Sequence, residues 1–172
     1  MRVVVEPYDP DWPLRFEGER ALLERVLEPW LVGGVHHIGS TAVPGLAAKP
    51  IIDMMAGVRD LEDARGAYEP LARHGYVHEP HRPGIAHHFA KREPDGRTAY
   101  GLHLTEPGSD LWRERLVFRD ALRSDAELAA EYEALKLGLA DDHADDGSAY
   151  VRAKRPFVAE VLARFGLQPG RR

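Results

Sequence analysis

The sequence predicts an α+β fold: a mixed β-sheet with flanking helices, followed by a helical C-terminal part. Three observations support this prediction. Apolar residues recur at helical spacing before residue 31, short apolar runs separated by turn residues follow up to residue 105, and helical spacing returns from Gly108 onward. The order of helix, mixed sheet and helices indicates an α+β domain. We expect one domain over residues 1–172, with its helices on one side of the sheet.

The first predicted helix follows a short β-prone run over residues 2–5 and a turn-forming segment. Asp11 is placed to cap its N-terminus, and the helix should continue to about Leu31. Its apolar face carries Phe16, Leu23, Val26, Leu27 and Trp30. The pair Gly33-Gly34 should end it, because glycine commonly follows the last turn of a helix.

The middle of the chain predicts the sheet. Strands are expected at residues 35–38, 50–58, 75–77, 85–91 and 97–105, with one helical turn within 41–48 and a helix over 60–74. The run 50–58 should be buried on both faces. Residues 78–84 form an irregular loop rich in proline and histidine, and residues 93–96 carry a hairpin-turn signal, Glu-Pro-Asp-Gly.

The C-terminal part predicts three helices. The first two are marked by apolar residues at helical spacing: Leu111, Phe118 and Leu122, then Leu128, Tyr132, Leu135 and Leu139. A polar break over residues 141–147 precedes the last helix. Pro156 should kink that helix or begin its second half, because proline cannot continue a helical hydrogen-bond ladder.

Composition excludes several classes of function. The chain has no cysteine, which rules out disulfides, thiolate metal sites and a cysteine nucleophile. The N-terminus lacks the apolar run of a signal peptide, and no stretch approaches the roughly 18 apolar residues of a membrane helix. We therefore expect a cytoplasmic protein without a membrane partner. A net charge of −5 argues against general nucleic-acid binding, although a local basic pocket is compatible with it. The sequence does not indicate an oligomeric state.

The stretch over residues 35–55 predicts a binding site. Gly39, Ser40 and Thr41 form a turn after one strand; glycine lets the backbone approach a phosphate, and serine adds a hydroxyl donor. A plain turn is the alternative. Asp53 lies in an otherwise apolar run, where a carboxylate is costly to bury without a partner. Together the turn and Asp53 could hold a phosphate and its metal ion.

Histidines and basic residues surround this stretch in the sequence. His37, His87, His88 and His103 lie on predicted strands, where alternation lets only one of two neighbours face a site. They could bind a transition metal, contact phosphate, transfer protons, or simply hydrogen-bond to backbone.

Lysine is rare here, and arginine forms a row. Of 23 basic residues only four are lysines, namely Lys49, Lys91, Lys136 and Lys154, which are therefore site candidates unless codon bias explains them. Arg115, Arg119 and Arg123 share one helical face, which could neutralise phosphates or form solvated salt bridges to Glu114 and Asp120.

These motifs resemble the GrpB family, also called UPF0157. The resemblance rests on HIGSTAVPGLAAKPIIDMM at residues 37–55, the histidine-bearing hairpin, FRDALR, YEALK and YVRAK, and it spans nearly the whole chain. The family belongs to the nucleotidyltransferase-fold superfamily, and a similar domain occurs fused to dephospho-coenzyme A kinase in some bacteria. The resemblance implies a mixed sheet with flanking helices. It matches Gly39-Ser40 to the superfamily's Gly-Ser signature, and Asp53 to its first metal-binding carboxylate.

One position departs from the superfamily pattern. Active members usually carry a second acidic residue two positions after the first, and here that position is Met55. A thioether does not suit magnesium, which prefers oxygen ligands. The third carboxylate usually comes from a later strand, where His103 and Glu106 are the nearest candidates. The pattern therefore disfavours standard two-metal nucleotidyl transfer.

Three hypotheses follow. The first is a nucleotidyltransferase-like enzyme that handles a nucleotide or another phosphorylated ligand, with a divalent metal, magnesium or manganese and alternatively zinc. Its catalytic residues would be Asp53 and His103, its metal ligands Asp53, His37 and His103, and its phosphate-binding residues Gly39, Ser40, Thr41, Lys49, Arg119, Lys136 and Lys154. The second is a binding module without catalysis, which Met55 favours. The third is a metal-dependent hydrolase that uses Asp53, His103 and either His37, His87 or His88 with zinc, manganese or nickel.

Overall fold

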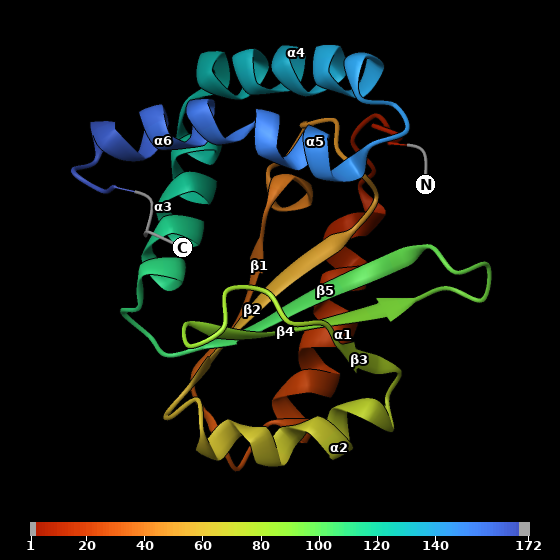
Figure 1. Ribbon diagram of the computed structural model, residues 1–172, viewed down its shortest axis with the longest axis vertical. Coiled ribbons are helices and arrows are strands. Elements are labelled where there is room, and N and C mark those ends of the chain that lie inside the picture. Colours follow the sequence, from red (N-terminus) through yellow and green to blue (C-terminus); the bar gives the residue numbers. More distant parts are fainter. Residues whose placement is uncertain (1–2, 169–172) are drawn as a thin grey trace.

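A five-stranded mixed sheet forms the centre of the molecule (Figure 1). The structure, a computed structural model, describes residues 3–168. The strands are β1 Leu31–Ile38, β2 Ile52–Val58, β3 Tyr76–His78, β4 Ala86–Arg92 and β5 Thr98–Thr105, in the spatial order β1-β2-β5-β4-β3. The central pair, β2 and β5, is parallel, and the other neighbours are antiparallel. The predicted α+β class is confirmed.

Helices precede, interrupt and follow the strands. They are α1 Asp11–Val26, α2 Tyr68–Ala72, α3 Asp110–Ser124, α4 Ala126–Asp142, α5 Gly147–Ala153 and α6 Arg155–Arg164, with 3-10 turns η1 Ser40–Ala42 and η2 Asp63–Ala67. Pro156 lies in the first turn of α6, as the sequence predicts. Figure 1 shows α4, α5 and α6 lying across the end of the sheet where β1 ends, above the Gly-Ser turn.

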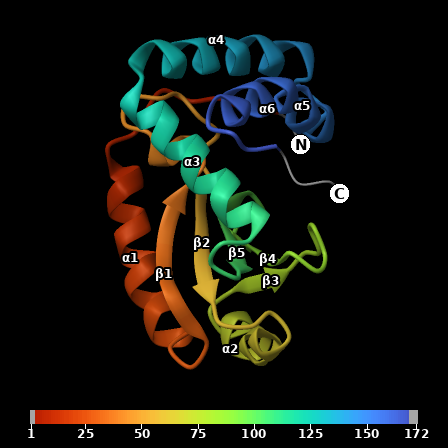
Figure 2. The same ribbon diagram turned by 90° about the vertical axis from the view of Figure 1, so that its left-hand side faces the viewer.

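The two faces of the sheet have different partners. On one face, Met54, Leu102 and other strand residues pack with α1 and α2 in the larger apolar cluster, and we call this the core face. On the opposite face His36 of β1 contacts Trp112 of α3, with ring centroids 5.1 Å apart. Figure 2 shows α1 and α3 on different sides of β1. The expectation that all helices lie on one side is therefore wrong.

The end of α1 and the start of β1 also differ from the prediction. The helix ends at Val26, and Leu31 already begins β1, which continues through Gly33 and Gly34. A Cβ at Gly33 would come within 2.9 Å of both Pro107 and Trp112. The first glycine thus permits close packing of α3 on the sheet rather than ending a helix, and this requirement is tertiary.

The N-terminal segment differs in two further details. Residues 3–5 form no strand, although Glu6 makes an isolated bridge with Ala48; Arg2 lies outside the described residues. Pro10 occupies the N-cap position of α1, and the Asp11 amide donates to Asp9 Oδ1 at 2.8 Å. Within residues 3–168, no helix combines the length and the apolar character needed to cross a bilayer.

Candidate functional site

Asp53 lies between two glycines near the start of β2. It pairs with Ile38 of β1 on one side and with Gly101 of β5 on the other. A Cβ at Gly39 would lie 3.0 Å from Asp53 Oδ2, and a Cβ at Gly101 would lie 2.7 Å from Asp53 Oδ1. Gly39 also has φ 73°, a conformation that favours glycine. The structure therefore brings the Gly-Ser turn and the acid together, and the space around the carboxylate exists because two side chains are absent.

Cations surround the Asp53 carboxyl. Burial raises the pKa of this carboxyl, and the positive charges of Arg115, His88, Lys154 and Lys49 oppose that rise, in decreasing order. We call Arg115, Lys154 and Lys49 the cationic ring. We call the side of the sheet that carries Asp53, opposite the core face, the Asp53 face. The partner that a buried acid requires is thus a group of positive charges.

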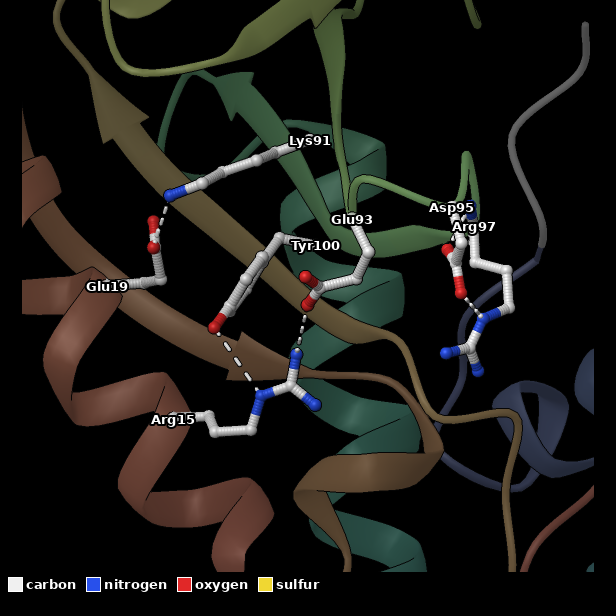
Figure 3. Close-up of polar contacts among 7 residues, drawn as sticks. All are labelled: Arg15, Glu19, Lys91, Glu93, Asp95, Arg97 and Tyr100. Carbon is white, nitrogen blue, oxygen red and sulfur yellow. Dashed lines mark hydrogen bonds and ion pairs between the residues drawn. The ribbon is translucent and has the colours of Figure 1, made fainter.

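Three of the four lysines gather at this place. The ammonium groups of Lys49 and Lys154 lie 5.6 and 4.5 Å from the centre of the Tyr150 ring. Burial lowers the pKa of Lys154 to about 8, with a further contribution from the charge of Lys49. The fourth lysine, Lys91, instead pairs with Glu19 at 2.5 Å on the core face of the hairpin (Figure 3).

Lys136 supports the turn instead of facing a ligand. It is 1% exposed, and its ammonium group donates to the carbonyl of Ala47. Glu133, from the same helix α4, accepts from the Ala47 amide at 2.6 Å. Burial, followed by repulsion from Lys154, lowers the pKa of Lys136 to about 7. The predicted phosphate contact of Lys136 is not supported, because its side chain is almost fully buried and its ammonium group lies over the Tyr132 ring and donates to the Ala47 carbonyl.

The arginine row on α3 divides into two roles. Arg119 Nη1 donates to the carbonyl of His37 at 3.1 Å, and Arg123 Nε donates to the carbonyl of Ala42 at 2.8 Å. Arg119 also pairs with Asp120 at 2.8 Å. These two arginines fix the backbone on either side of the turn. The member that approaches Asp53 is Arg115, which the sequence placed in this row but left out of the predicted phosphate-binding set.

The turn residues have different environments. Ser40 makes a side-chain hydrogen bond to Tyr132, a tyrosine whose pKa burial raises to about 12. Thr41 is buried; its hydroxyl donates to the carbonyl of Ile51 at 3.0 Å and lies 2.9 Å from His37 Nε2. Ser40 therefore belongs to the site, while Thr41 holds the turn against the start of β2 and is not a phosphate ligand in this arrangement.

His37 does not lie with Asp53. Its ring stacks on Phe16 of α1, 4.8 Å between centroids, on the core face. Burial, with the charges of Arg123 and Arg119, lowers its pKa to about 4. His37 pairs with Met54, and Ile38 pairs with Asp53. Because successive strand residues face opposite sides of the sheet, His37 and Asp53 lie on opposite faces. The predicted set of metal ligands, Asp53, His37 and His103, is therefore not assembled.

The hairpin histidines separate in the same way. His88 and His103 are direct cross-strand partners with ring centroids 4.6 Å apart, and a Cβ at Gly101 would lie 3.7 Å from His88 Nε2. Both belong to the Asp53 face. His87 lies on the core face, where Nδ1 is 2.9 Å from the Tyr68 hydroxyl and Nε2 is 2.6 Å from the Leu61 carbonyl.

The donors around Asp53 do not fit a pair of magnesium ions. In the part of the chain that the structure describes, no three histidine or acidic side chains are arranged to hold a metal ion. The next β2 residue on the same face is Met55, whose strand neighbours are His36 and His103. Magnesium requires oxygen ligands at near-octahedral positions, and one carboxylate provides too few for two ions.

A cavity of about 930 Å³ opens on the α1 side of the sheet, and of the cationic ring Lys49 lines it. Its lining includes Lys49 and the two residues that lead into β2, Trp12 and Arg15 of α1, and the β4–β5 hairpin. Figure 3 shows part of this wall: Arg15 contacts Glu93 at 3.6 Å and Tyr100 at 3.4 Å. Cavities of this size can hold a small molecule. The sequence did not reveal it, because the hairpin signal carries no information about what packs against it.

Comparison with known proteins identifies the family. The family model described as "GrpB protein" matches residues 2–164. Glutamate-rich protein GrpB of Alkalihalophilus pseudofirmus is 31% identical over 174 residues, covering 93% of this chain and 94% of that protein. The UPF0157 protein YqkA of Bacillus subtilis is 33% identical over 157 residues, 91% of this chain but only 45% of the relative. A dephospho-CoA kinase of Mycolicibacterium paratuberculosis is 28% identical over 193 residues and is spanned to 44%.

Solved structures agree with this assignment. GrpB from Enterococcus faecalis superposes with a TM-score of 0.84 at 28% identity, covering 95% of this chain and all of that one. The Cid1 poly(U) polymerase, described with Mg and 3′-dATP bound, gives a TM-score of 0.55 at 13% identity, covering 87% of this chain and 49% of that one. The second likeness shows the nucleotidyltransferase-like fold. By sequence and by structure, the chain belongs to the GrpB family.

Proposed function

We propose that this protein binds a phosphorylated small molecule, a nucleotide or a close relative, on the Asp53 face. The observation that carries the proposal is the charge balance. The cationic ring contributes three positive charges and Asp53 at most one negative charge, so at least two positive charges remain. Guanidinium and ammonium groups in this setting are strong ligands of phosphate oxygens. An anionic ligand would supply the missing negative charge.

The surrounding geometry is suited to the rest of such a ligand. The Ser40 hydroxyl and the backbone after Gly39 can approach a phosphoryl group, while Lys49 belongs both to the cationic ring and to the cavity of about 930 Å³. The cavity lies on the α1 side of the sheet, and its lining has six carboxylates against three basic side chains, so it would suit an uncharged part of the ligand that reaches past Lys49 and not a second phosphate. The likeness to a poly(U) polymerase supports a nucleotide as this molecule.

In this proposal the protein's own cations, rather than two metal ions, neutralise the phosphates. Asp53 could hold at most one magnesium or manganese ion that arrives with the phosphate oxygens, because magnesium often binds one carboxylate together with its substrate's phosphates. The zinc-dependent hydrolase loses two of its three versions, since His37 and His87 lie on the core face. The third version keeps Asp53, His88 and His103 on one face, but among the described residues no three such side chains are arranged to hold a metal ion.

Metal-dependent transfer of a nucleotidyl group is the second candidate, and the fold likeness favours it. The single carboxylate opposes it, and His103, the candidate proton shuttle, is a neutral buried imidazole. Either activity is compatible with the cytoplasmic location and small-molecule partner expected from the sequence.

Calorimetric titration with ATP, GTP, CTP and UTP tests the proposal, with and without magnesium, manganese or zinc. We expect at least one nucleotide to bind, and Lys154→Gln to weaken its binding about tenfold or more, since a hydrogen bond to a charged group contributes about 1.5–3 kcal/mol. Lys91→Gln is the matched control, because Lys91 pairs with Glu19 and should leave binding unchanged. Absence of binding by all four nucleotides, or equal binding by Lys154→Gln and the original protein, would contradict the proposal.

The variant Asp53→Asn separates the two modes of neutralisation. If the protein's cations hold the phosphates, removing the carboxylate charge removes a repulsion, and binding stays equal or becomes tighter without metal. If a metal ion held by Asp53 carries the phosphates, the same variant loses affinity only in the presence of that metal. Prolonged incubation with each nucleotide, followed by chromatography for released pyrophosphate or phosphate, separates binding alone from transfer or hydrolysis.

A further inference from the structure

Three buried side-chain nitrogens on one side of the molecule lack a hydrogen-bond partner. Across residues 3–168 the buried side-chain atoms in this condition are Arg82 Nη2, His103 Nδ1 and Arg115 Nε. They lie near one another: the ring of His81, the residue before Arg82, is 6.2 Å from that of His103, and Arg82 pairs with Glu114, the residue before Arg115 on α3. Buried polar groups are almost always hydrogen-bonded, so three exceptions at one place call for an explanation.

The structure holds these three groups firmly. His103 is 6% exposed and sits on β5, the strand beside β2. Arg82 belongs to the loop before β4, where its φ of 52° is unusual for a residue with a side chain. Its Nη1 pairs with Glu114 of α3 at 2.9 Å, and the two side chains are only 15% and 13% exposed. Arg115, the next residue of α3, faces the same place.

The chemistry of the three groups specifies the ligand. Arginine nitrogens are donors only, and a neutral imidazole can carry its proton on Nδ1. Three nitrogens of this region therefore lack an acceptor, and although Glu114 balances the charge of Arg82, Arg115 adds a further positive charge. A metal ion would meet two guanidinium groups here, which repel it. The partner that satisfies all three is an oxyanion.

We infer that Arg82, His103 and Arg115 form a second phosphoryl-binding subsite, across β2 from Ser40. The inference rests on the proposed function and deepens it: the ligand carries at least two phosphoryl groups, one held near Ser40 and Lys154 and another near Arg82. Arg115 lies between the two subsites because it approaches both Asp53 and His103. The substrate class is therefore a di- or polyphosphate rather than a monophosphate.

Titration calorimetry of the full chain with orthophosphate, pyrophosphate and tripolyphosphate tests this subsite. We expect tripolyphosphate to bind at least tenfold more tightly than orthophosphate. Arg82→Gln and His103→Asn should each reduce the tripolyphosphate affinity about tenfold. Arg113→Gln is the matched control: Arg113 lies on α3, as Arg115 does, is exposed and pairs with Asp110 at 3.4 Å. It should bind like the original protein.

A second variant guards against a folding defect. Arg82→Gln leaves Glu114 without its arginine, so the double variant Arg82→Gln with Glu114→Gln removes both charges of the pair. It should fold with a circular dichroism spectrum like that of the original and still bind tripolyphosphate about tenfold more weakly. If the double variant and His103→Asn bind tripolyphosphate as tightly as the original protein, the three nitrogens contact solvent only and the subsite is wrong.

The two proposals can fail separately. If Lys154→Gln weakens tripolyphosphate binding while the Arg82 and His103 variants do not, the proposed function stands and the second subsite is refuted. If the Arg82 and His103 variants weaken binding while Lys154→Gln does not, the second subsite stands and the first one is refuted. If none of them matters, both are refuted.

Discussion

The two faces of the sheet both carry histidines, but these histidines have different environments. On the core face His37 and His87 are tied to neighbouring polar groups beneath α1 and α2. On the Asp53 face His103 has a nitrogen without a partner, and the acid lies among cations. Neighbours in sequence, such as His87 and His88, thus belong to different environments. The difference teaches that polar groups on the core face are hydrogen-bonded within the protein, whereas those on the Asp53 face remain available to a ligand.

The largest expected effect comes from introducing an acid on one face or the other. Met54 and Met55 are both fully buried, but Met54 packs in the apolar cluster and Met55 lies on the Asp53 face. Met54→Asp should cost about 4 kcal/mol or more, because a carboxylate buried without a partner is among the most destabilising changes. Met55→Asp should cost less, because the cationic ring is near. Urea denaturation of both variants measures the difference.

The same pair also tests the metal argument. Met55→Asp restores the second carboxylate of the superfamily pattern, so we expect it to gain a magnesium-dependent rise in melting temperature that the original protein lacks. Equal destabilisation by the two substitutions would show that the faces do not differ as described.

A smaller effect is expected from filling the space beside the acid. Gly101→Ala would place a Cβ 2.7 Å from Asp53 Oδ1, and overpacking of this kind costs about 1–3 kcal/mol. In an Asp53→Ala background the clash is gone, so the same substitution should then be nearly neutral. Gly138→Ala is the control; nothing lies within 4 Å of its Cβ, and alanine should stabilise α4 by up to about 1 kcal/mol. If the destabilisations by Gly101→Ala and Asp53→Ala are additive, the space around the Asp53 carboxyl does not depend on Gly101.

The smallest predicted effect is a pH dependence of binding. The pKa of Lys154 is lowered from its ordinary value to about 8, so its ammonium is charged below that pH and neutral above it. Nucleotide affinity should therefore fall as the pH rises through about 8, where the phosphates are already fully ionised. Lys154→Arg keeps the charge and should remove the decline between pH 7 and 9.5, measured by calorimetry. A decline that persists in Lys154→Arg would assign it to another group.

Much of this contrast could be predicted from the sequence, and some could not. Helical periodicity and turn residues located the sheet, the hairpin and the C-terminal helices, and the apolar run with a single acid located Asp53. Alternation indicated that His87 and His88 diverge but not which one faces the acid, because that depends on strand pairing. The rotation of α3, which selects Arg115 over Arg119, and the packing role of Gly33 are tertiary properties that local patterns do not encode.

The rarity of lysine in the sequence predicted part of the site. Rarity indicated all four lysines; Lys49, Lys136 and Lys154 gather at one place, whereas Lys91 pairs with Glu19 on the core face. It could not show that Lys136 is buried and donates to the Ala47 carbonyl, since that bond depends on how α4 lies over the turn. Composition can thus locate a site more readily than it can assign roles within it.

The most direct test of the central claim is a crystal structure of the protein with ATP. Crystals grown in the same way without ATP are the control. The account predicts phosphate density on the Asp53 face, in contact with Lys154 and Arg115 and reaching toward Arg82. Phosphates bound elsewhere on the molecule, or no density at concentrations that saturate binding in solution, would contradict it.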